Sequence, residues 1–350
     1  MRYPKPLQKG GCIGFIAPSF GCATEPYKSR FDNTLRIFRE KGYTLSLGPN
    51  CYESSGIGIS NTPEKCAAEL NAAMTDNQSD VIITCGGGEL MCEVVPQIDF
   101  AAIAKAEPKW YMGYSDNTNY TFLSAILADT AAIYGPCAGA FGRQPWHPSI
   151  DDALALLTGE KTFVQNYDAW EIEEETGDLG EEPDPLTPYN CTRPFAPVTY
   201  IGANKAEGER IEMSGRLIGG CVDILTILLG TRFDRVSDFL DKYEKDGFIW
   251  YLECCDMDPL MIRRAFWTMK EAGWFRGVKG FLIGRPRRFD LDFMGVNRLN
   301  AVTDILADLN VPVIMDLDIG HLPPMMPIIN GAMGDVTFED NRLRIDYRQE

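Results

Sequence analysis

The stretch Val81-Ile82-Ile83-Thr84-Cys85-Gly86-Gly87-Gly88 combines a short, continuous apolar run with three consecutive glycines. Such a run, ended by glycine, is typical of a strand that is buried on both faces of a parallel sheet. Similar runs occupy residues 12–17, 43–47, 109–114 and 131–134, and helical spacing separates them, as in 26–41 and from Thr62 onward. This alternation predicts an α/β fold whose first sheet is mostly parallel and covered on both faces.

The pattern is interrupted between residues 160 and 210. Eight acidic residues and no basic one lie between Glu171 and Asp184, and several prolines follow. Such composition predicts a solvated insertion, with a lid beside a substrate cleft as the alternative. A second unit begins near Met213, with strands expected at 247–252, 278–283 and 311–315, helices at 259–272 and 296–309, and a terminal hairpin. We therefore expect an N-terminal domain at 1–150, a linker at 151–210 and a C-terminal domain at 211–350.

Length and charge exclude several classes of protein. A chain of 350 residues fits two domains better than one, because single cores stop growing near about 250–300 residues. The net charge of −17 argues against nucleic acid or an anionic membrane as a main partner. No apolar run approaches the roughly 20 residues of a membrane span, and the first residues lack the apolar segment of a signal peptide. We expect a cytoplasmic protein.

The eleven cysteines are scattered and form no Cys-x-x-Cys pair. Most lie inside apolar runs, where cysteine acts as a small hydrophobic residue, so we expect buried, reduced thiols. With only two histidines in the chain, a three-ligand zinc site is hard to assemble. The sequence predicts neither a metal nor another cofactor.

Those two histidines, His147 and His321, limit the chemistry that the chain can perform near neutral pH. A hydrolase that deprotonates a serine or cysteine usually needs an imidazole, because few other side chains titrate there unaided. His321 follows the apolar run 311–315, which predicts a loop at the carboxyl end of a strand, where α/β enzymes place their chemistry. His147 lies between Pro145 and Pro148 and is more typical of an ordinary loop residue.

Ser115 follows the predicted strand 109–114 and precedes a helical run. A serine at a sharp strand-to-helix turn is exposed, and the first amides of the helix can stabilise an oxyanion beside it. The sequence is not the Gly-x-Ser-x-Gly elbow, because Asn117 stands at its last position. A simple N-cap role for Ser115 fits the spacing equally well.

Two further features lie at strand ends. Gly86-Gly87-Gly88 permits close approach to a ligand, and one of its amides could be a second oxyanion donor; the phosphate-loop signatures are absent. Glu253 ends the expected strand 247–252 and could orient His321. Asp256 and Asp258 are close enough in sequence that spacing does not choose among the three carboxylates.

Five short motifs resemble one family when taken together. They are the glycine pair Gly87-Gly88 leading to 95–100, Gly113-Tyr114-Ser115-Asp116, Gly215-Arg216-Leu217-Ile218-Gly219-Gly220, Leu252-Glu253 and Gly320-His321. From about Cys12 to Gly334 the chain resembles the LD-carboxypeptidase family of serine peptidases, including its branch of microcin C self-immunity proteins. The resemblance implies a catalytic triad of Ser115, Glu253 and His321, and so selects Glu253. It also implies an N-terminal Rossmann-like domain, a smaller C-terminal domain of mixed β and α structure, and a homodimer.

The resulting hypothesis is a metal-free serine carboxypeptidase or amidase that acts on small peptides with an unusual linkage. A murein tetrapeptide and a peptidyl-nucleotide conjugate are examples of such substrates. His321 would take the proton from Ser115, Glu253 would orient His321, and the amides of Asp116 and of Gly87 or Gly88 would hold the oxyanion. The alternatives are a cysteine hydrolase that uses Cys85, Cys254 or Cys255, and a non-catalytic binding protein that retains the fold.

Overall fold

The computed structural model describes residues 1–172 and 184–348. The described residues form two compact units. The first contains residues 1–161, 184–190 and 327–330, and the second contains 162–172, 191–326 and 331–348. Most of the acidic segment 171–184 therefore lies outside the described residues, and its expected role as insertion or lid stays a prediction.

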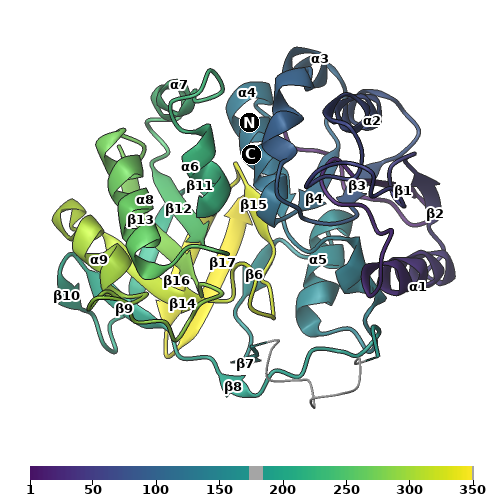
Figure 1. Ribbon diagram of the computed structural model, residues 1–350. Coiled ribbons are helices and arrows are strands. Elements are labelled where there is room, and N and C mark those ends of the chain that lie inside the picture. The colour runs from purple at the N-terminus through teal and green to yellow at the C-terminus, as the bar shows by residue number, and fades with distance from the viewer. Residues whose placement is uncertain (173–183, 349–350) are drawn as a thin grey trace. The chain divides into compact units, whose positions relative to one another are not determined.

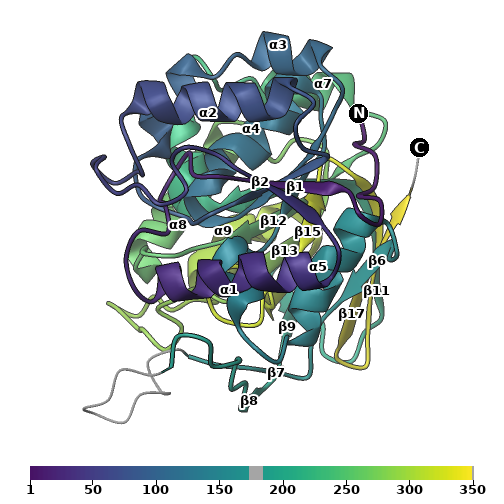
Figure 2. The same ribbon diagram turned by 90° about the vertical axis from the view of Figure 1, so that its right-hand side faces the viewer.

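The first unit is built on a six-stranded sheet in the order β15-β5-β4-β3-β1-β2. Five strands are parallel: β1 (Cys12–Ile16), β2 (Thr44–Leu47), β3 (Val81–Thr84), β4 (Trp110–Gly113) and β5 (Ala132–Tyr134). The helices are α1 (Tyr27–Glu40), α2 (Pro63–Thr75), α3 (Phe100–Lys105), α4 (Thr118–Ala128) and α5 (Pro148–Thr158). Figure 2 shows α2 and α3 on one side of β1 and β2, and α1 and α5 on the other. The predicted mostly parallel N-terminal sheet is confirmed.

One strand of this sheet was not expected. The edge strand β15 (Ile328–Asn330) pairs antiparallel with β5 and comes from the last tenth of the chain. The Asn330 side chain is buried and donates to the Thr121 carbonyl at 2.8 Å, which fixes the strand against α4. Three residues between loops carry too little periodicity to predict such a strand.

The second unit contains a nine-stranded mixed sheet in the order β10-β9-β14-β13-β12-β11-β16-β17-β6. Its four central strands are parallel: β11 (Ile211–Cys221), β12 (Phe248–Glu253), β13 (Val278–Gly284) and β14 (Pro312–Leu317). The flanking strands are antiparallel: β6 (Phe163–Gln165), β9 (Val198–Ile201), β10 (Asn204–Lys205), β16 (Met333–Glu339) and β17 (Arg342–Arg348). The expected terminal hairpin is the pair β16–β17, and the expected C-terminal domain of mixed β and α structure is confirmed.

The helices of the second unit are α6 (Val222–Leu228), α7 (Val236–Lys242), α8 (Pro259–Glu271) and α9 (Asn300–Leu306). A separate two-stranded sheet consists of β7 (Ala169–Trp170) and β8 (Arg193–Pro194). Figure 1 shows α8 and α9 in front of the parallel strands. The helix expected at 296–309 is shorter than predicted. Phe293 and Val296 pair with each other, and the Asn297 side chain accepts from the amides of Leu299 and Asn300, so the helix begins only at residue 300.

Local chemistry explains the helix starts that the sequence signalled. Thr62 and Asp258 accept from the amides of Lys65 and Met261, and proline occupies the first helical position of both α2 and α8. The Gly215–Gly220 motif lies inside β11. Gly219 has φ +154°, and a Cβ there would collide with the Tyr251 carbonyl of β12, so only glycine fits this close strand contact.

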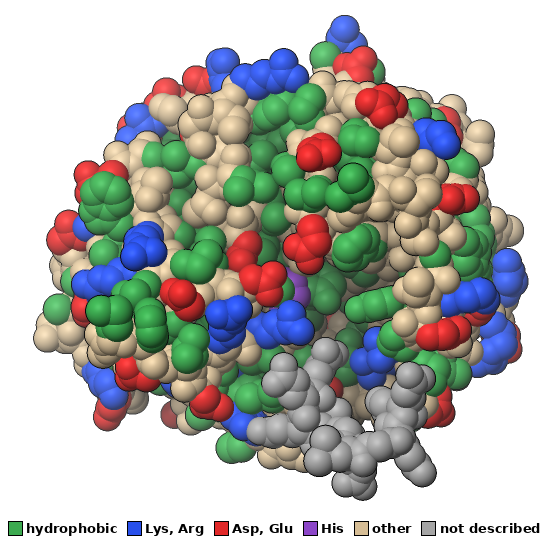
Figure 3. Space-filling view, in the orientation of Figure 1, with side chains coloured by type: hydrophobic (Ala, Val, Ile, Leu, Met, Phe, Trp, Pro, Cys, Tyr) green, Lys and Arg blue, Asp and Glu red, His purple; other side chains and the backbone are tan. Residues whose placement is uncertain are grey.

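Among the described residues, no helix is long and apolar enough to cross a membrane. All eleven cysteines are present as free thiols. On the face drawn in Figure 3, acidic and basic side chains are interspersed among apolar ones.

Candidate active site

Ser115 occupies a strained turn in the first unit. It follows β4 directly, begins a 3-10 turn that leads into α4, and is half-buried. Its φ of +62° lies in the left-handed region, which costs free energy for a residue with a side chain and is found at functional sites. The caps of the 3-10 turn and of α4 are Tyr114 and Asn117. The simple N-cap interpretation of Ser115 is therefore wrong, because the serine lies inside the turn.

Asn117 ties this turn to the glycine segment after β3. Its buried Nδ2 donates to the Gly86 carbonyl at 2.8 Å and to the Tyr114 carbonyl at 3.2 Å. Its Oδ1 accepts from the Tyr111 hydroxyl at 2.7 Å. Sequence reasoning noted Asn117 only as a departure from the elbow motif. The signal in the sequence that points to it is an amide side chain shortly after a buried strand.

Gly87 lies directly against Ser115. A Cβ at position 87 would sit 3.2 Å from the Cβ and 3.3 Å from the Oγ of Ser115, so glycine alone allows this approach without displacement. A Cβ at Gly88 would collide with the Ser19 hydroxyl. Among the residues that the structure describes, no acceptor takes the amide hydrogens of Gly87 and Gly88. The segment therefore combines donors with space beside the serine.

Glu253 and His321 form a pair in the second unit. Glu253 ends β12 and is fully buried, and its Oε2 lies 2.9 Å from Nδ1 of His321, in the loop after β14. Two glycines make room for the carboxylate. A Cβ at Gly320 would lie 2.5 Å from Glu253 Oε2, and one at Gly284 would lie 2.9 Å from Glu253 Cβ. The His321 side chain keeps 13% of its surface exposed, so this loop holds an oriented imidazole that a substrate can still reach.

The competing residues lie elsewhere. Asp256 is exposed and pairs with Arg287 at 3.8 Å, and Asp258 caps α8. His147 is the N-cap of α5, where its Nδ1 accepts from the Ser149 amide at 3.1 Å. Burial lowers the pKa of His147. These three residues have structural explanations that do not involve His321.

The pKa of His321 is raised well above its usual value. Burial alone would lower it, but the Glu253 carboxylate, together with a contact from Cys255, outweighs that effect. A buried carboxylate at Nδ1 stabilises the imidazolium and fixes which ring nitrogen carries the proton. His321 is therefore a stronger base than a free imidazole.

The His321 loop is braced by a buried ion pair. Arg285 and Asp318 are both almost fully buried and contact each other directly. Asp318 also accepts from the Tyr167 amide at 2.8 Å, and Arg285 donates to the Asp316 carbonyl at 3.0 Å. Breaking such a pair leaves an uncompensated charge, so the loop has one preferred arrangement.

The candidate cysteines differ in their surroundings. Cys85 and Cys254 are buried, and burial raises the pKa of both thiols well above the usual value, which makes them poor nucleophiles. Cys255 is half-buried and lies near His321. Among the described residues, no three His, Cys, Asp or Glu side chains are grouped to hold a metal ion.

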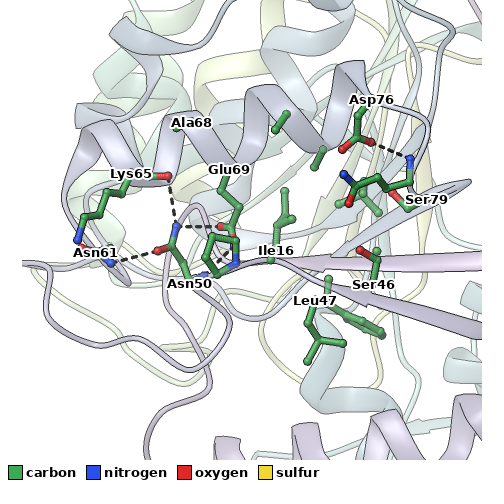
Figure 4. A pocket seen from close by; sticks show the side chains of 18 of the residues that line it. Ile16, Ser46, Leu47, Asn50, Asn61, Lys65, Ala68, Glu69, Asp76 and Ser79 are labelled. Carbon is green, nitrogen blue, oxygen red and sulfur yellow. Dashed lines mark hydrogen bonds between the residues drawn. The ribbon is translucent and has the colours of Figure 1, made fainter.

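A hollow of roughly 590 Å³ lies in the first unit between α2 and the strands β1 and β2. Figure 4 shows Asn50, Lys65 and Glu69 at one end of it and Asp76 and Ser79 at the other. The carboxylate of Glu69 is buried, and burial raises its pKa. It accepts from the Ala17 amide at 2.9 Å and from the Asn50 amide at 3.0 Å, so its hydrogen bonds brace the ends of β1 and β2.

Two family models match the chain. The LD-carboxypeptidase N-terminal domain matches residues 13–135, and the C-terminal domain of the same family matches residues 214–336. The chain belongs to the LD-carboxypeptidase family. Among its relatives in this family, the Escherichia coli microcin C7 self-immunity protein MccF is 26% identical over 352 residues, which cover 97% of this chain and 94% of that protein.

A Bacillus subtilis protein named as a murein peptide carboxypeptidase is 25% identical, over 93% of this LD-carboxypeptidase family member and 90% of the relative. A solved structure of MccF with glutamyl sulfamoyl guanosine matches with a TM-score of 0.78 and 23% identity, covering 99% of this chain and 98% of that one. These likenesses support the two-domain α/β fold described above.

We predict that the pH dependence of activity follows His321. Because a base must be neutral to accept a proton, kcat/KM should rise with pH through an apparent pKa above the reference value of about 6.5. In Glu253→Gln this limb should move to lower pH while kcat falls, because the group that raises the pKa is gone. A limb that stays in place in Glu253→Gln would contradict the pairing. The free energy of unfolding gives a second readout. Because the pKa of His321 is raised in the folded state, protonated His321 stabilises the folded protein below about pH 6.5, and this contribution should disappear as pH rises through the folded-state pKa.

A second prediction concerns Gly87→Ala. The added methyl group should displace the Ser115 side chain or the glycine segment by a few tenths of an ångström and lower kcat by about 10- to 100-fold. Thermal unfolding should change little, because φ at Gly87 is not positive. Gly139→Ala is the matched control, since a Cβ there meets only Arg30 at ordinary distance. Equal activities for the two variants would show that Gly87 does not adjoin the reacting group.

Proposed function

We propose that this LD-carboxypeptidase family member is a serine-type carboxypeptidase or amidase with the triad Ser115, Glu253 and His321. His321 accepts the proton of the Ser115 hydroxyl as Oγ attacks the carbonyl carbon of the scissile bond. The same proton passes to the leaving amine, and water then hydrolyses the acyl-enzyme. Glu253 keeps the imidazole oriented and stabilises its protonated form.

The observation that carries this proposal is the buried Glu253–His321 hydrogen bond of 2.9 Å. Burying a carboxylate costs free energy even when an imidazole is its partner, and such pairs cluster at functional sites. The left-handed turn at Ser115 adds independent support, because strain of this kind accumulates at nucleophiles and other functional residues.

The oxyanion would be held by backbone amides of the first unit. The Asp116 amide follows the nucleophile directly, and the Gly87 and Gly88 amides lie on the segment that adjoins Ser115. Donors aimed at the developing charge in a site with little water provide the largest single contribution in many hydrolases. The glycine segment would provide such a donor from its backbone, without a side chain.

For the substrate we propose a small peptide with an unusual linkage. The relatives suggest two chemical classes: an amino acid joined to a nucleotide, as in the MccF complex with glutamyl sulfamoyl guanosine, and a murein peptide, as in the name of the Bacillus subtilis relative. The acidic residues of the segment 171–184 favour substrates that carry an amine, such as diaminopimelate- or lysine-containing peptides. We further infer a homodimer in the cytoplasm, with neither nucleic acid nor membrane as a partner.

The direct test is Ser115→Ala with a panel of tetrapeptide, isopeptide and peptidyl-nucleotide substrates followed by mass spectrometry. We expect cleavage of at least one class by the native protein and a loss in kcat of roughly 10⁴- to 10⁶-fold in the variant, as for other triad members. Ser237→Ala, on the exposed side of α7, is the control and should be fully active. Near-normal turnover by a folded Ser115→Ala protein would refute the proposal, and no cleavage of any class by the native protein would favour a binding protein.

Thiol alkylation separates the serine mechanism from a cysteine mechanism. Alkylation of the accessible Cys255 should hinder substrate or His321 without abolishing turnover, and Cys255→Ala should retain activity because no proton or bond passes through it. Complete inactivation of Cys255→Ala, with Ser115→Ala still active, would establish the cysteine alternative.

A further inference from the structure

The residue after the nucleophile carries a buried carboxylate with three donors around it. Asp116 is 1% exposed. Its Oδ2 accepts from the Ser19 hydroxyl at 2.5 Å and from the Met91 amide at 3.0 Å, and its Oδ1 accepts from Nδ2 of Asn119 at 2.9 Å. Sequence reasoning used only the backbone amide of this residue, so the role of its side chain is unassigned.

These donors belong to the segments that build the turn around Ser115. Ser19 lies in the loop after β1, Met91 follows the glycine segment after β3, and Asp116 itself follows β4. The Ser19 hydroxyl fills the space where a Cβ of residue 88 would be, so it touches the glycine segment as well as the carboxylate. A single side chain thus connects three loops at the carboxyl edge of one sheet.

The carboxylate does not favour folding at neutral pH. Burial raises the pKa of Asp116 to about 6, although its hydrogen bonds oppose this shift, and the charge of Glu89 adds to it. A folded-state pKa above the ordinary value means that this group's contribution to stability decreases as pH rises from about 4 to about 6. A charge retained at such a cost is typical of a functional site.

We propose that the Asp116 carboxylate is a positioning residue, which holds the Gly87-Gly88 segment and the Ser115 turn in the geometry that the oxyanion hole requires. The inference rests on the proposed function, because it assigns a role in the same reaction. Both oxygens of the ionised carboxylate accept hydrogen bonds. A proton on Oδ2 would compete with the Met91 amide hydrogen or force the Ser19 hydroxyl to rotate and become the acceptor, and a proton on Oδ1 would oppose the Asn119 N–H group. Protonation therefore changes the links among the three loops.

Three other titratable groups face Asp116. They are Glu89 on the glycine segment, Cys92 on the following 3-10 turn and Tyr111 on β4. Burial raises the pKa of the Cys92 thiol and of the Tyr111 hydroxyl above values that already exceed neutrality. Asp116→Asn removes the titration of the Asp116 carboxyl group and leaves its hydrogen-bond partners Ser19, Met91 and Asn119 unchanged.

The test compares Asp116→Asn and Ser19→Ala with the matched control Glu69→Gln. This control also replaces a buried carboxylate that accepts from several N–H donors, but it lies on α2 of the same unit. We expect kcat to fall by about 100-fold in Asp116→Asn and about tenfold in Ser19→Ala, with KM within about threefold of the native value. The double variant should be no worse than Asp116→Asn, because both changes remove the same link. Glu69→Gln should keep kcat within about twofold once the folded fraction is measured.

The pH profile supplies a readout that a purely structural role would not move. In the native protein, log kcat/KM should decrease by about one for each unit that the pH is lowered from the pKa of His321 to pH 6, because His321 becomes protonated. Below pH 6 the decrease should be about two per unit, because His321 and Asp116 must both be deprotonated. In Asp116→Asn the slope should stay near one throughout. A single slope in the native protein, or an unchanged kcat in Asp116→Asn, would overturn the inference.

The variants separate a failure of the proposed function from a failure of the Asp116 role. If Ser115→Ala is active, the proposed function itself is wrong. If Ser115→Ala is inactive while Asp116→Asn and Ser19→Ala turn over normally, the triad stands and Asp116 has no positioning role. If Asp116→Asn does not fold, the kcat of Ser19→Ala tests the positioning role, because this variant removes one neutral donor and leaves the Asp116 carboxylate in place. An unchanged kcat in Ser19→Ala would then overturn the inference.

Discussion

A carboxylate that has been taken out of water must find hydrogen-bond donors or a cation, and this constraint organises both units of the protein. Asp116 is surrounded by Ser19, Met91 and Asn119, and Glu253 by the imidazole of His321. Asp318 is held by Arg285 and by the Tyr167 amide. Each of these carboxylates lies just beyond or at the carboxyl end of a parallel strand, where loops from neighbouring strands meet. The loops therefore have little freedom to rearrange, because any other arrangement would leave a charge unpaired.

Glycine and backbone strain provide the space that these contacts need. Gly284 and Gly320 lie against the side chain of Glu253, Gly87 lies against Ser115, and Gly88 leaves room for Ser19. Larger side chains at these positions would push apart the groups that must approach within hydrogen-bond distance. The free energy spent on a left-handed serine and a desolvated aspartate is recovered elsewhere, in two sheets whose central strands are buried on both faces.

The sequence predicts much of this arrangement because part of the information is local. The alternation of short apolar runs with helical spacing identifies the parallel sheets, and the scarcity of histidine directs attention to His321. The choice of Glu253 over Asp256 and Asp258 is different, since it depends on glycines that lie 31 and 67 residues further along the chain. The side chain of Asp116 was missed for the same reason: its partner Ser19 is 97 residues away. Spacing along the chain does not predict contacts between residues so far apart. The start of α9 was missed for a different reason, since it depends on a single asparagine side chain.

The short strand β15 has a consequence for how the protein is made. It completes the edge of the sheet that carries Ser115, yet it is encoded by residues 328–330. A ribosome delivers the chain from its N-terminus, so the first five strands emerge long before their sixth neighbour. Until then the outer edge of β5 offers unpaired amides and carbonyls to any passing strand. In the nascent chain this sheet cannot close before residue 330 has been synthesised, and a product cut short before residue 328 would keep the serine but leave its sheet open.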